Sequence, residues 1–419
     1  MNICVFGSTL QAGVIAGLFA EYGHQVYWCP QIEVEQQSSV HYQDENLNQL
    51  IQKQMTNHSL QLMSLKNIHL QSDVFLFSFN PTEFKQAITL AEELKTQPII
   101  HPKLMLNGST FGLEGTEKLK QILVADHWAY LPDTIQEGNA IQSFIASKQV
   151  IVGIDEENTQ QLVKELLRPF FQLKQQYLFM PFLDAEFTKL SISGMLATRI
   201  SYMNDMAQVA EKLNIDIQNV KQGLAADNRI GATYLSPGVG FGGENFSHDI
   251  LTLTGTVAGS GIQSQLLDQV WNINEQQKEI LFRKLWNYYQ GQLTGKVVAI
   301  WGASFKENTS SIDNSPIHAM LAALWAQGVI VQLHDPQALE RVANVYGDRP
   351  DLILCQDQYQ AVANAHAICL LTAWKQYWSP DYTKLLQKMA HPLILDGRNI
   401  LDPDFVKAQG FAYQGVGRV

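Results

Sequence analysis

The sequence predicts an α/β protein in which two doubly wound parallel sheets are joined by a central all-helical segment. Short apolar runs alternate with helical patterns over residues 1–183, and the same alternation begins again near residue 294. The residues between them read as long helices. We therefore predict three domains, 1–183, 184–293 and 294–419. A chain of 419 residues, 46% of them hydrophobic, has enough material for several cores.

Composition narrows the classes of partner and site. The net charge is −11 and Lys and Arg form no run, which argues against nucleic acid and anionic membrane surfaces, because both require clustered cations. The first residues read as a strand and no apolar run reaches membrane-spanning length, so we expect a cytoplasmic protein. The cysteines show neither zinc nor disulfide spacing, and we expect no metal site. They are Cys4, Cys29, Cys355 and Cys369.

The first elements form a β-α-β unit of the dinucleotide-binding type. The apolar run Ile3–Phe6 leads through a turn into a helical pattern, and the strand pattern HQVYWC follows. Of the three glycines in GxGxxG, Gly7 remains for the tight turn, while the second is Thr9 and the third is Ala12. Alanine is tolerated at the third place, but a threonine side chain at the second crowds the approach to a pyrophosphate. The prediction is an NAD site with a weakened motif at Gly7, Thr9, Leu10, Gln11 and Ala12.

The rest of the first domain repeats strand and helix. Its strand patterns are SDVFLFSF, PIIHPKLML, HWAYLPD and KQVIVGID, and the second of these leads to Ser109 and Thr110. The central segment then opens with a long helical pattern, for which Asp184 can serve as N-cap and Glu186 suits the first turn. Apolar residues recur along it at helical spacing, so this helix should lie deep in the molecule or in a dimer contact. They are Leu190, Ala197, Ile200, Met203, Ala207 and Ala210.

A second apolar helix is predicted over residues 264–291, and the third domain follows it. Strand patterns begin with GKVVAIWG and continue through VIVQLHD, AHAICLLT, HPLILDGRN and GFAYQGVGRV. A helix is predicted from Ser315-Pro316 to Gln327. This order of elements again favours a mostly parallel sheet covered on both faces.

Several motifs together resemble the UDP-glucose/GDP-mannose dehydrogenase family. In the central segment they are a lysine, Lys189, followed by LATRISYMND, an Arg-Ile-Gly, GFGG and FSHD; in the third domain they are FKENT and DGRN, which match FKxxT and DGRN of the family. The resemblance covers essentially the whole chain. Family members oxidise the C6 alcohol of a nucleotide sugar to a carboxylate with two NAD molecules, through a cysteine nucleophile in a GGxC turn.

The resemblance implies roles for individual residues. Lys189 matches the lysine that stabilises the developing oxyanion, and Asp249 the aspartate that positions water. Asp133 matches a carboxylate lining the sugar, and Ser109 with Thr110 a pair near the nicotinamide; loop capping is the plainer interpretation of these three. The implied substrate-binding residues are Arg229, which in the family reaches a neighbouring subunit's site, and Phe241, Gly242, Lys306 and Arg398.

The chain also departs from the family at functional positions. Asn245 stands in place of the nucleophilic cysteine, and an amide nitrogen cannot form the covalent adduct. Ser193 replaces the asparagine one helical turn after the lysine, and His248 replaces a lysine. Pro30 stands where an acidic residue would hold the ribose, and Asp313 where an arginine would lie near the diphosphate.

Replacements for the lost groups can be named from the sequence. Glu33 is a candidate for the ribose, against the plainer interpretation as a surface glutamate. Glu244 is a candidate base and His248 a candidate proton shuttle, against simple solvation.

Three functional hypotheses follow, and Lys189, Arg229, Asp249, Lys306 and Arg398 together favour a polyanionic ligand over the third, a purely structural scaffold. The first is a divergent NAD-dependent oxidoreductase acting on a CH–OH group of a nucleotide sugar or related phosphorylated ligand, without the covalent cysteine step. The second is a catalytically inactive relative that binds a nucleotide sugar or a protein partner. Under the first two, we expect a polyanionic small ligand, a homodimer through the central helix, and neither nucleic acid nor membrane as a partner.

Overall fold

The structure, a computed structural model, describes residues 1–30, 40–65, 72–97, 102–262 and 265–418. It divides into two compact units, Met1–Ile192 and Ser193–Val419. Each unit has its own sheet and its own hydrophobic cores. The division into three domains stays a prediction. Within the described residues, no helix is both long and apolar enough to cross a membrane.

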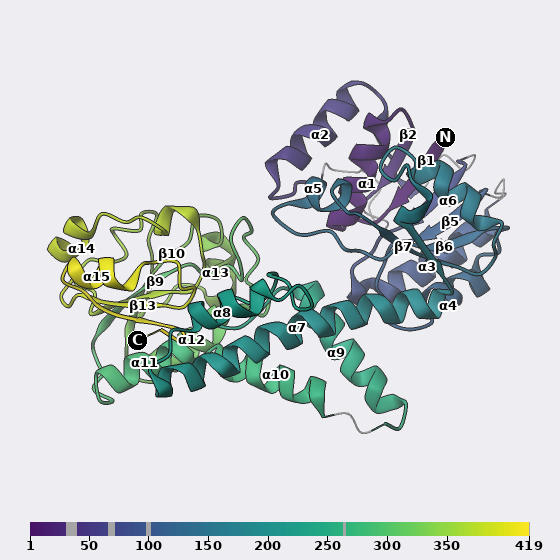
Figure 1. Ribbon diagram of the computed structural model, residues 1–419. Helices are drawn as coiled ribbons and strands as arrows, with labels where there is room; N and C mark the ends of the chain where they lie inside the picture. Colours follow the sequence, from purple (N-terminus) through teal and green to yellow (C-terminus); the bar gives the residue numbers. More distant parts are fainter. Residues whose placement is uncertain (31–39, 66–71, 98–101, 263–264, 419) are drawn as a thin grey trace. The chain divides into compact units, whose positions relative to one another are not determined.

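The N-terminal unit, coloured purple to blue-teal in Figure 1, is built on a sheet of eight strands. Their order is β3-β2-β1-β4-β5-β6-β7-β8. All neighbouring strands run parallel except β6 and β7. The order reverses between β1 and β4, which is the doubly wound arrangement. The strands are β1 (Asn2–Phe6), β2 (Gln25–Cys29), β3 (Leu60–Leu62), β4 (Val74–Phe77), β5 (Leu104–Asn107), β6 (Trp128–Tyr130), β7 (Val150–Ile154) and β8 (Tyr177–Met180).

Helices cover both faces of this sheet. Successive side chains of a strand point to opposite faces, so Ile3 and Val5 enter one core while Cys4 and Phe6 enter the other. The first core is covered by α1, α2, α5 and α6, and the second by α3, α4 and the start of α7. The bounds are α1 (Leu10–Glu21), α2 (Glu45–Thr56), η2 (Pro81–Glu83), α3 (Phe84–Thr96), α4 (Gly115–Ile122), α5 (Ala140–Ile145), α6 (Thr159–Leu167), η3 (Lys174–Gln176) and α7 (Phe182–Leu213).

The C-terminal unit contains a six-stranded sheet, entirely parallel, with the order β11-β10-β9-β12-β13-β14. Val298 and Ile300 enter one core and Ala299 and Trp301 the other. Two doubly wound sheets and a helical region between them confirm the predicted α/β class. The strands are β9 (Val297–Trp301), β10 (Ile330–His334), β11 (Leu352–Leu354), β12 (Ala367–Leu370), β13 (Leu393–Asp396) and β14 (Ala412–Gly415).

The helices of this unit differ from the sequence prediction at one place. The single helix predicted over 264–291 is two helices, α10 and α11, which meet at Lys278 and Glu279. The helix predicted from Ser315 is confirmed, because Ser315 caps α12 by accepting from the N–H of Ile317. The bounds are α8 (Ile217–Ala226), α9 (Glu244–Gly259), α10 (Leu266–Gln277), α11 (Ile280–Tyr288), α12 (Pro316–Trp325), α13 (Leu339–Tyr346), η4 (Lys375–Tyr377), α14 (Tyr382–Lys388) and α15 (Pro403–Ala408).

Helix α7 carries the predicted apolar stripe. Leu190, Ala197, Met203, Ala207 and Ala210 are at most 4% exposed, and Ile200 is partly buried. The predicted N-cap at Asp184 is wrong, since α7 begins at Phe182 and Asp184 lies within the first turn. The long helical pattern and its buried face were therefore predicted correctly, and its first residue was not.

Glu186, near the start of α7, holds the beginning of α4. Its carboxylate accepts from the backbone N–H of Glu114 at 2.7 Å and of Thr116 at 2.9 Å. Glu186 is only 3% exposed, and burial raises the pKa of its carboxyl against the effect of these hydrogen bonds. The side chain thus supplies an acceptor for N–H groups that a helix leaves unsatisfied at its start.

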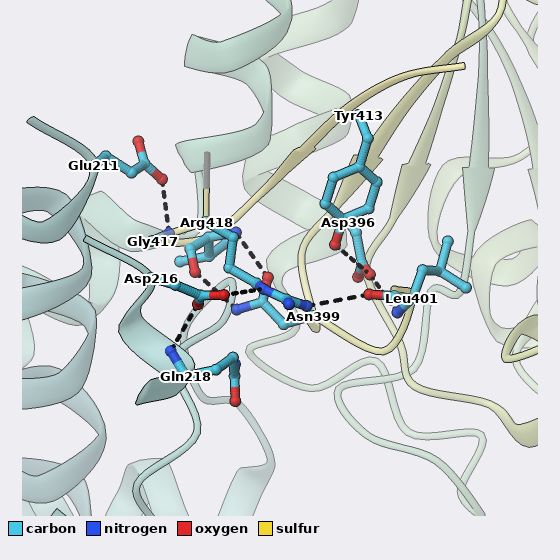
Figure 2. Close-up of polar contacts among 10 residues, drawn as sticks. Glu211, Asp216, Gln218, Asp396, Asn399, Leu401, Tyr413, Gly417 and Arg418 are labelled. Carbon is cyan, nitrogen blue, oxygen red and sulfur yellow. Dashed lines mark hydrogen bonds and ion pairs between the residues drawn. The ribbon is translucent and has the colours of Figure 1, made fainter. Parts of the chain in front are cut away.

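The last residues of the chain are fastened to α7 and α8 (Figure 2). The N–H of Gly417 donates to Glu211 Oε1 of α7 at 2.7 Å, and its carbonyl accepts from the N–H of Ile217 at 2.9 Å. Arg418 Nε donates to Asp216, the N-cap of α8, at 3.3 Å. These contacts join the segment after β14 to the helices of the same unit.

Gly417 leaves no room for a side chain. Its φ is +68°, and a Cβ there would lie 2.7 Å from Ile217 Cγ2 and 2.8 Å from Ala207 Cβ. We predict that Gly417→Ala lowers the free energy of unfolding by about 2–4 kcal/mol, from left-handed backbone strain and overpacking, measured by urea denaturation. Gly410→Ala is the control, because φ there is +92° but nothing lies within 4 Å of a Cβ. Equal losses would show that the close contact is not the cause.

Candidate functional site

Three buried amide side chains hold the glycine-rich turn 238–243 in the C-terminal unit. Asn204 Oδ1 accepts from the N–H of Gly238 at 2.8 Å, and Gln277 Nε2 donates to its carbonyl at 2.7 Å. Asn274 makes both bonds to Phe241: its Oδ1 accepts from the N–H of Phe241 at 2.7 Å, and its Nδ2 donates to the carbonyl of Phe241 at 3.2 Å. All three amides are 0% exposed. They fix the path of the turn from α7 and α10.

The other side of the turn meets the segment after β9. The N–H of Gly243 donates to the carbonyl of Asp313 at 2.8 Å. A Cβ on Gly242 would lie 2.6 Å from the carbonyl oxygen of Asn314, and one on Gly243 would lie 3.0 Å from the Phe305 ring. Glycine is therefore required here by close approach. Gly242, a predicted substrate-binding residue, is buried in this contact, whereas the side chain of Phe241, another, is buried with Ala197, Ile250 and Val270.

Helix α9 follows the turn directly and carries four of the residues named from the sequence, Glu244, Asn245, His248 and Asp249. Ser193 Oγ of α7 donates to Asp249 Oδ2 at 2.7 Å, and both side chains are at most 3% exposed. The structure thus brings Ser193 and Asp249 together. Asn245 lies in the first turn of α9 and is exposed, whereas His248 Nδ1 pairs with Thr252 Oγ1 at 3.2 Å within the same helix.

Arg398 lies where the segments of this region converge. Its Nε donates to the carbonyl of Leu371 at 2.6 Å and its Nη2 to the carbonyl of Phe305 at 3.0 Å. A Cβ on Gly238 would be 3.5 Å from Arg398 Nη1, so the guanidinium also lies beside the glycine-rich turn. Burial lowers the pKa of Arg398 to about 10, against the opposite effect of Glu307 and Asp396.

Lys306 and Arg341 add positive charge near Phe305 and Asp313. Lys306 Nζ lies 5.5 Å from the centroid of the Phe305 ring. Asp313, which the sequence places where an arginine is expected, forms an ion pair with Arg341 Nη1 of α13 at 3.6 Å and accepts from Ser311 Oγ at 2.6 Å. The half-exposed Arg341 therefore balances the negative charge that Asp313 introduces at this position.

Lys278 is a buried cation that the sequence analysis did not single out. Its Nζ donates to Asn314 Oδ1 at 2.6 Å and pairs with Glu275 Oε1 at 2.7 Å. The side chain is 4% exposed, and burial lowers the pKa of its ammonium group. Asn314 in turn donates to Ser247 of α9 at 2.7 Å, which links this lysine to the helix that bears Asp249.

In the N-terminal unit, the backbone of the turn after β1 passes close to the backbone at the end of β4. Gly7 has φ of +99°, and a Cβ there would lie 2.0 Å from the carbonyl oxygen of Ser78. Thr9 is the N-cap of α1, and its Oγ1 accepts from the N–H of Ala12 at 3.1 Å. Leu10 begins the helix and Gln11 is buried behind it.

The other predicted residues of this unit lie at strand ends or on α7. Ser109 Oγ accepts from the N–H of Phe79 at 2.9 Å, and Thr110 beside it is 8% exposed. Asp133 Oδ1 accepts from the N–H of Ile135 at 3.0 Å, which is the capping interaction expected of an aspartate in a loop. Lys189 is partly buried on α7.

Sequence models of one family match the chain in three consecutive segments. Residues 1–171 match the NAD binding domain, 183–276 the central domain, and 299–403 the UDP binding domain of the UDP-glucose/GDP-mannose dehydrogenase family. The chain belongs to this family.

Relatives and solved structures agree with this assignment. The UDP-glucose 6-dehydrogenase of Pseudomonas aeruginosa is 31% identical over 451 residues, covering 100% of this chain and 98% of the relative. That of Rickettsia bellii is 29% identical over 286 residues, covering 68% and 66%. A UDP-glucose dehydrogenase from Pyrobaculum islandicum has the same fold, with a TM-score of 0.85 at 22% identity and coverage of 100% and 98%. UDP-D-ManNAc dehydrogenase from Pyrococcus horikoshii follows, with a TM-score of 0.82 at 19% identity and coverage of 100% and 99%.

The family's NAD binding domain raises the question of whether this chain's residues fit the dinucleotide. A pyrophosphate is bound by N–H groups at the start of α1, and here the Thr9 hydroxyl accepts from one of them, that of Ala12. A ribose requires an acceptor at the end of β2, and the buried Pro30 offers no side-chain acceptor. Glu33, the candidate replacement, lies outside the described residues. At these two places the described residues thus offer one N–H that Thr9 already occupies and no side-chain acceptor for the ribose.

Arg229 differs in its surroundings from the other predicted site residues. Its side chain is 89% exposed and forms an ion pair with Asp227, two residues away, at 2.6 Å. Among the described residues, the side-chain hydrogen bonds of Arg229 go to Asp227 and not to the glycine-rich turn. Its predicted role toward a neighbouring subunit stays a prediction.

Proposed function

We propose that this chain binds a nucleotide sugar in its C-terminal unit and does not oxidise it to the acid by the covalent route. The observation that carries the proposal is the placement of Arg398. Its fork bonds two backbone carbonyls and lies against the glycine-rich turn. A guanidinium held in this way is preorganised, so less rotational freedom is lost when it binds an anionic oxygen.

Neighbouring groups support a diphosphate as the anion. Lys306 supplies further positive charge from the segment after β9, and Arg341 of α13 balances the negative charge of Asp313. Cations of this kind recognise phosphate through charge-assisted hydrogen bonds. The match of residues 299–403 to a UDP binding domain supports the same ligand class.

The chemistry at the turn supports binding without acid formation. Asn245 occupies the first turn of α9, and its delocalised amide nitrogen is not a nucleophile. All four cysteines are buried in strands or just after one, and burial raises the pKa of Cys29 to about 12 and that of Cys369 still further. A thiol with a raised pKa supplies no thiolate, which is the form that attacks an aldehyde.

The test is a ligand panel on the full chain. We expect UDP-glucose or GDP-mannose to raise the midpoint of thermal unfolding, because a ligand at about 100 times its dissociation constant adds about 2.7 kcal/mol to stability. NADH formation with the same sugars and NAD should stay at background, followed by absorbance. Thermal midpoints that no nucleotide or nucleotide sugar moves would contradict binding. NADH production would instead support the first hypothesis, a two-electron oxidation.

We also propose that the chain forms a homodimer through α7. Large apolar side chains repeat along one stripe of this helix at four-, seven- and eight-residue spacing and are 46–63% exposed. An exposed apolar stripe of this length is typical of a helix that packs against a partner. The residues are Leu183, Phe187, Met195, Tyr202 and Val209.

Charges placed in this stripe should separate the subunits. We predict that the double variant Met195→Glu and Tyr202→Glu is a monomer at concentrations where the wild type is a dimer, because two carboxylates would be buried without partners. Light scattering after size exclusion measures the mass. The control is Gln208→Glu, at an exposed position of α7 outside the stripe. Glu211→Gln is unsuitable as a control because Glu211 accepts a hydrogen bond from Gly417. A wild-type chain of monomer mass at all concentrations would contradict the proposal.

A further inference from the structure

The carboxyl ends of β1, β4, β5 and β6 define the place where a doubly wound sheet takes its ligand. The strand order reverses between β1 and β4, and ligands of such sheets bind in the crevice outside the strands at this point. In the N-terminal unit, that place is bordered by the turn after β1, by Ser78 after β4, by Gly108 after β5 and by Leu131 after β6.

Side chains of the protein itself bridge this crevice. Thr9 Oγ1 and Ser78 Oγ share a short hydrogen bond, which joins the turn after β1 to the end of β4. Ser78 Oγ also bonds to Gln11 Oε1 at 3.0 Å, and Gln11 Nε2 donates to the carbonyl of Leu131 at 3.1 Å. Thr9, Ser78 and Gln11 are 8%, 1% and 2% exposed. The chain of bonds therefore runs from the end of β1 to the end of β6.

The amide of Gln11 also fills space at the strand ends. A Cβ on Gly108 would lie 2.1 Å from Gln11 Oε1, so the amide oxygen lies directly over the backbone after β5. Thr9 at the same time accepts from the N–H of Ala12, a donor of the kind that binds phosphate at a helix start. The side chains of Thr9, Gln11 and Ser78 and the N–H of Ala12 thus have hydrogen-bond partners within the protein.

We propose that Thr9, Gln11 and Ser78 close the dinucleotide crevice of the N-terminal unit, so that this unit folds as a self-capped domain and does not bind NAD or NADH. This inference concerns the N-terminal unit and does not depend on nucleotide-sugar binding by the other. A closed network of three buried side chains resists displacement, because each broken hydrogen bond would leave a buried polar group unpaired.

The experiment measures NADH binding by calorimetry and by nucleotide fluorescence on the full chain. Wild type should show no binding up to about 1 mM NADH, a limit equivalent to about 4 kcal/mol of binding free energy. The variant Thr9→Gly, Gln11→Val and Pro30→Asp removes the bridge and restores a ribose acceptor, and it should bind NADH below that limit. Thr9→Ser with Pro30→Asp is the matched control; it keeps the hydroxyl and Gln11, and it should not bind.

Two outcomes would overturn the inference. One is a wild-type dissociation constant for NADH well below 1 mM, which requires no variant and so is independent of variant folding. The other is absence of binding by the triple variant when circular dichroism and thermal unfolding show that it is folded. UDP-glucose binding, measured on the same samples, reports on the other unit and separates failure of this inference from failure of the proposed function.

Discussion

Arg398→Ala is expected to weaken UDP-glucose binding by about 30-fold to 1,000-fold, which corresponds to about 2–4 kcal/mol. The substitution removes a cation and also the two hydrogen bonds to the carbonyls of Leu371 and Phe305. The segment that bears Lys306 then loses one of the contacts that hold it beside the glycine-rich turn. Calorimetric titration of the full chain measures the change.

Two further variants help to assign the cause of the change in affinity. Arg398→Lys keeps the charge and loses the fork, so we expect an affinity between those of wild type and Arg398→Ala. Arg168→Ala, at an exposed position in the N-terminal unit, should bind as wild type does. If Arg398→Ala is folded and binds UDP-glucose unchanged, the guanidinium has no part in ligand binding.

Asn274→Ala is expected to lower the free energy of unfolding by about 2–5 kcal/mol, because it leaves both backbone groups of Phe241 buried and unpaired. The amide is 0% exposed, and its two hydrogen bonds with Phe241 are 2.7 and 3.2 Å long. Loss of the clamp should also weaken nucleotide-sugar binding, since the path of the turn is no longer fixed. Urea denaturation and ligand titration on the same sample measure the two effects.

The control for this prediction is Asn287→Ala. Asn287 lies on the exposed face of α11, where a truncation changes stability by about 0.5 kcal/mol or less. A loss at Asn274 no larger than the loss at Asn287 would show that the turn is held by its other contacts. In that case the glycines packed against Phe305 and Asn314 are the stronger constraint.

The sheets and helices were predictable because their signal is local. Strands buried on both faces are short apolar runs, and each is followed by a helical pattern, so the order of elements determines a doubly wound sheet. Local signals fail at boundaries. Asp184 has the residue type of an N-cap, yet α7 already begins at Phe182, after Pro181. At Lys278, no glycine or proline in the sequence marks the end of α10 and the start of α11.

The contacts within the site were not predictable, because they join residues far apart in the chain. Ser193 and Asp249 were each named from the sequence, but their hydrogen bond spans 56 residues. Arg341, which pairs with Asp313, belongs to no motif. One of the buried amides could have been predicted from the sequence, because Asn204 falls in the apolar stripe of α7, four residues after Ile200. A polar residue on a buried helical face must have a partner, and here the partner is the turn.

Helix α7 has a consequence for how the protein unfolds. Phe182 and Ala185, at its start, belong to a core of the N-terminal unit, while Met203 and Ala207, further along, belong to a core of the C-terminal unit. Residues of this one helix therefore belong to a core in each unit. Loss of either core would expose the apolar residues of α7 that it covers, and we expect that stretch of the helix to fray.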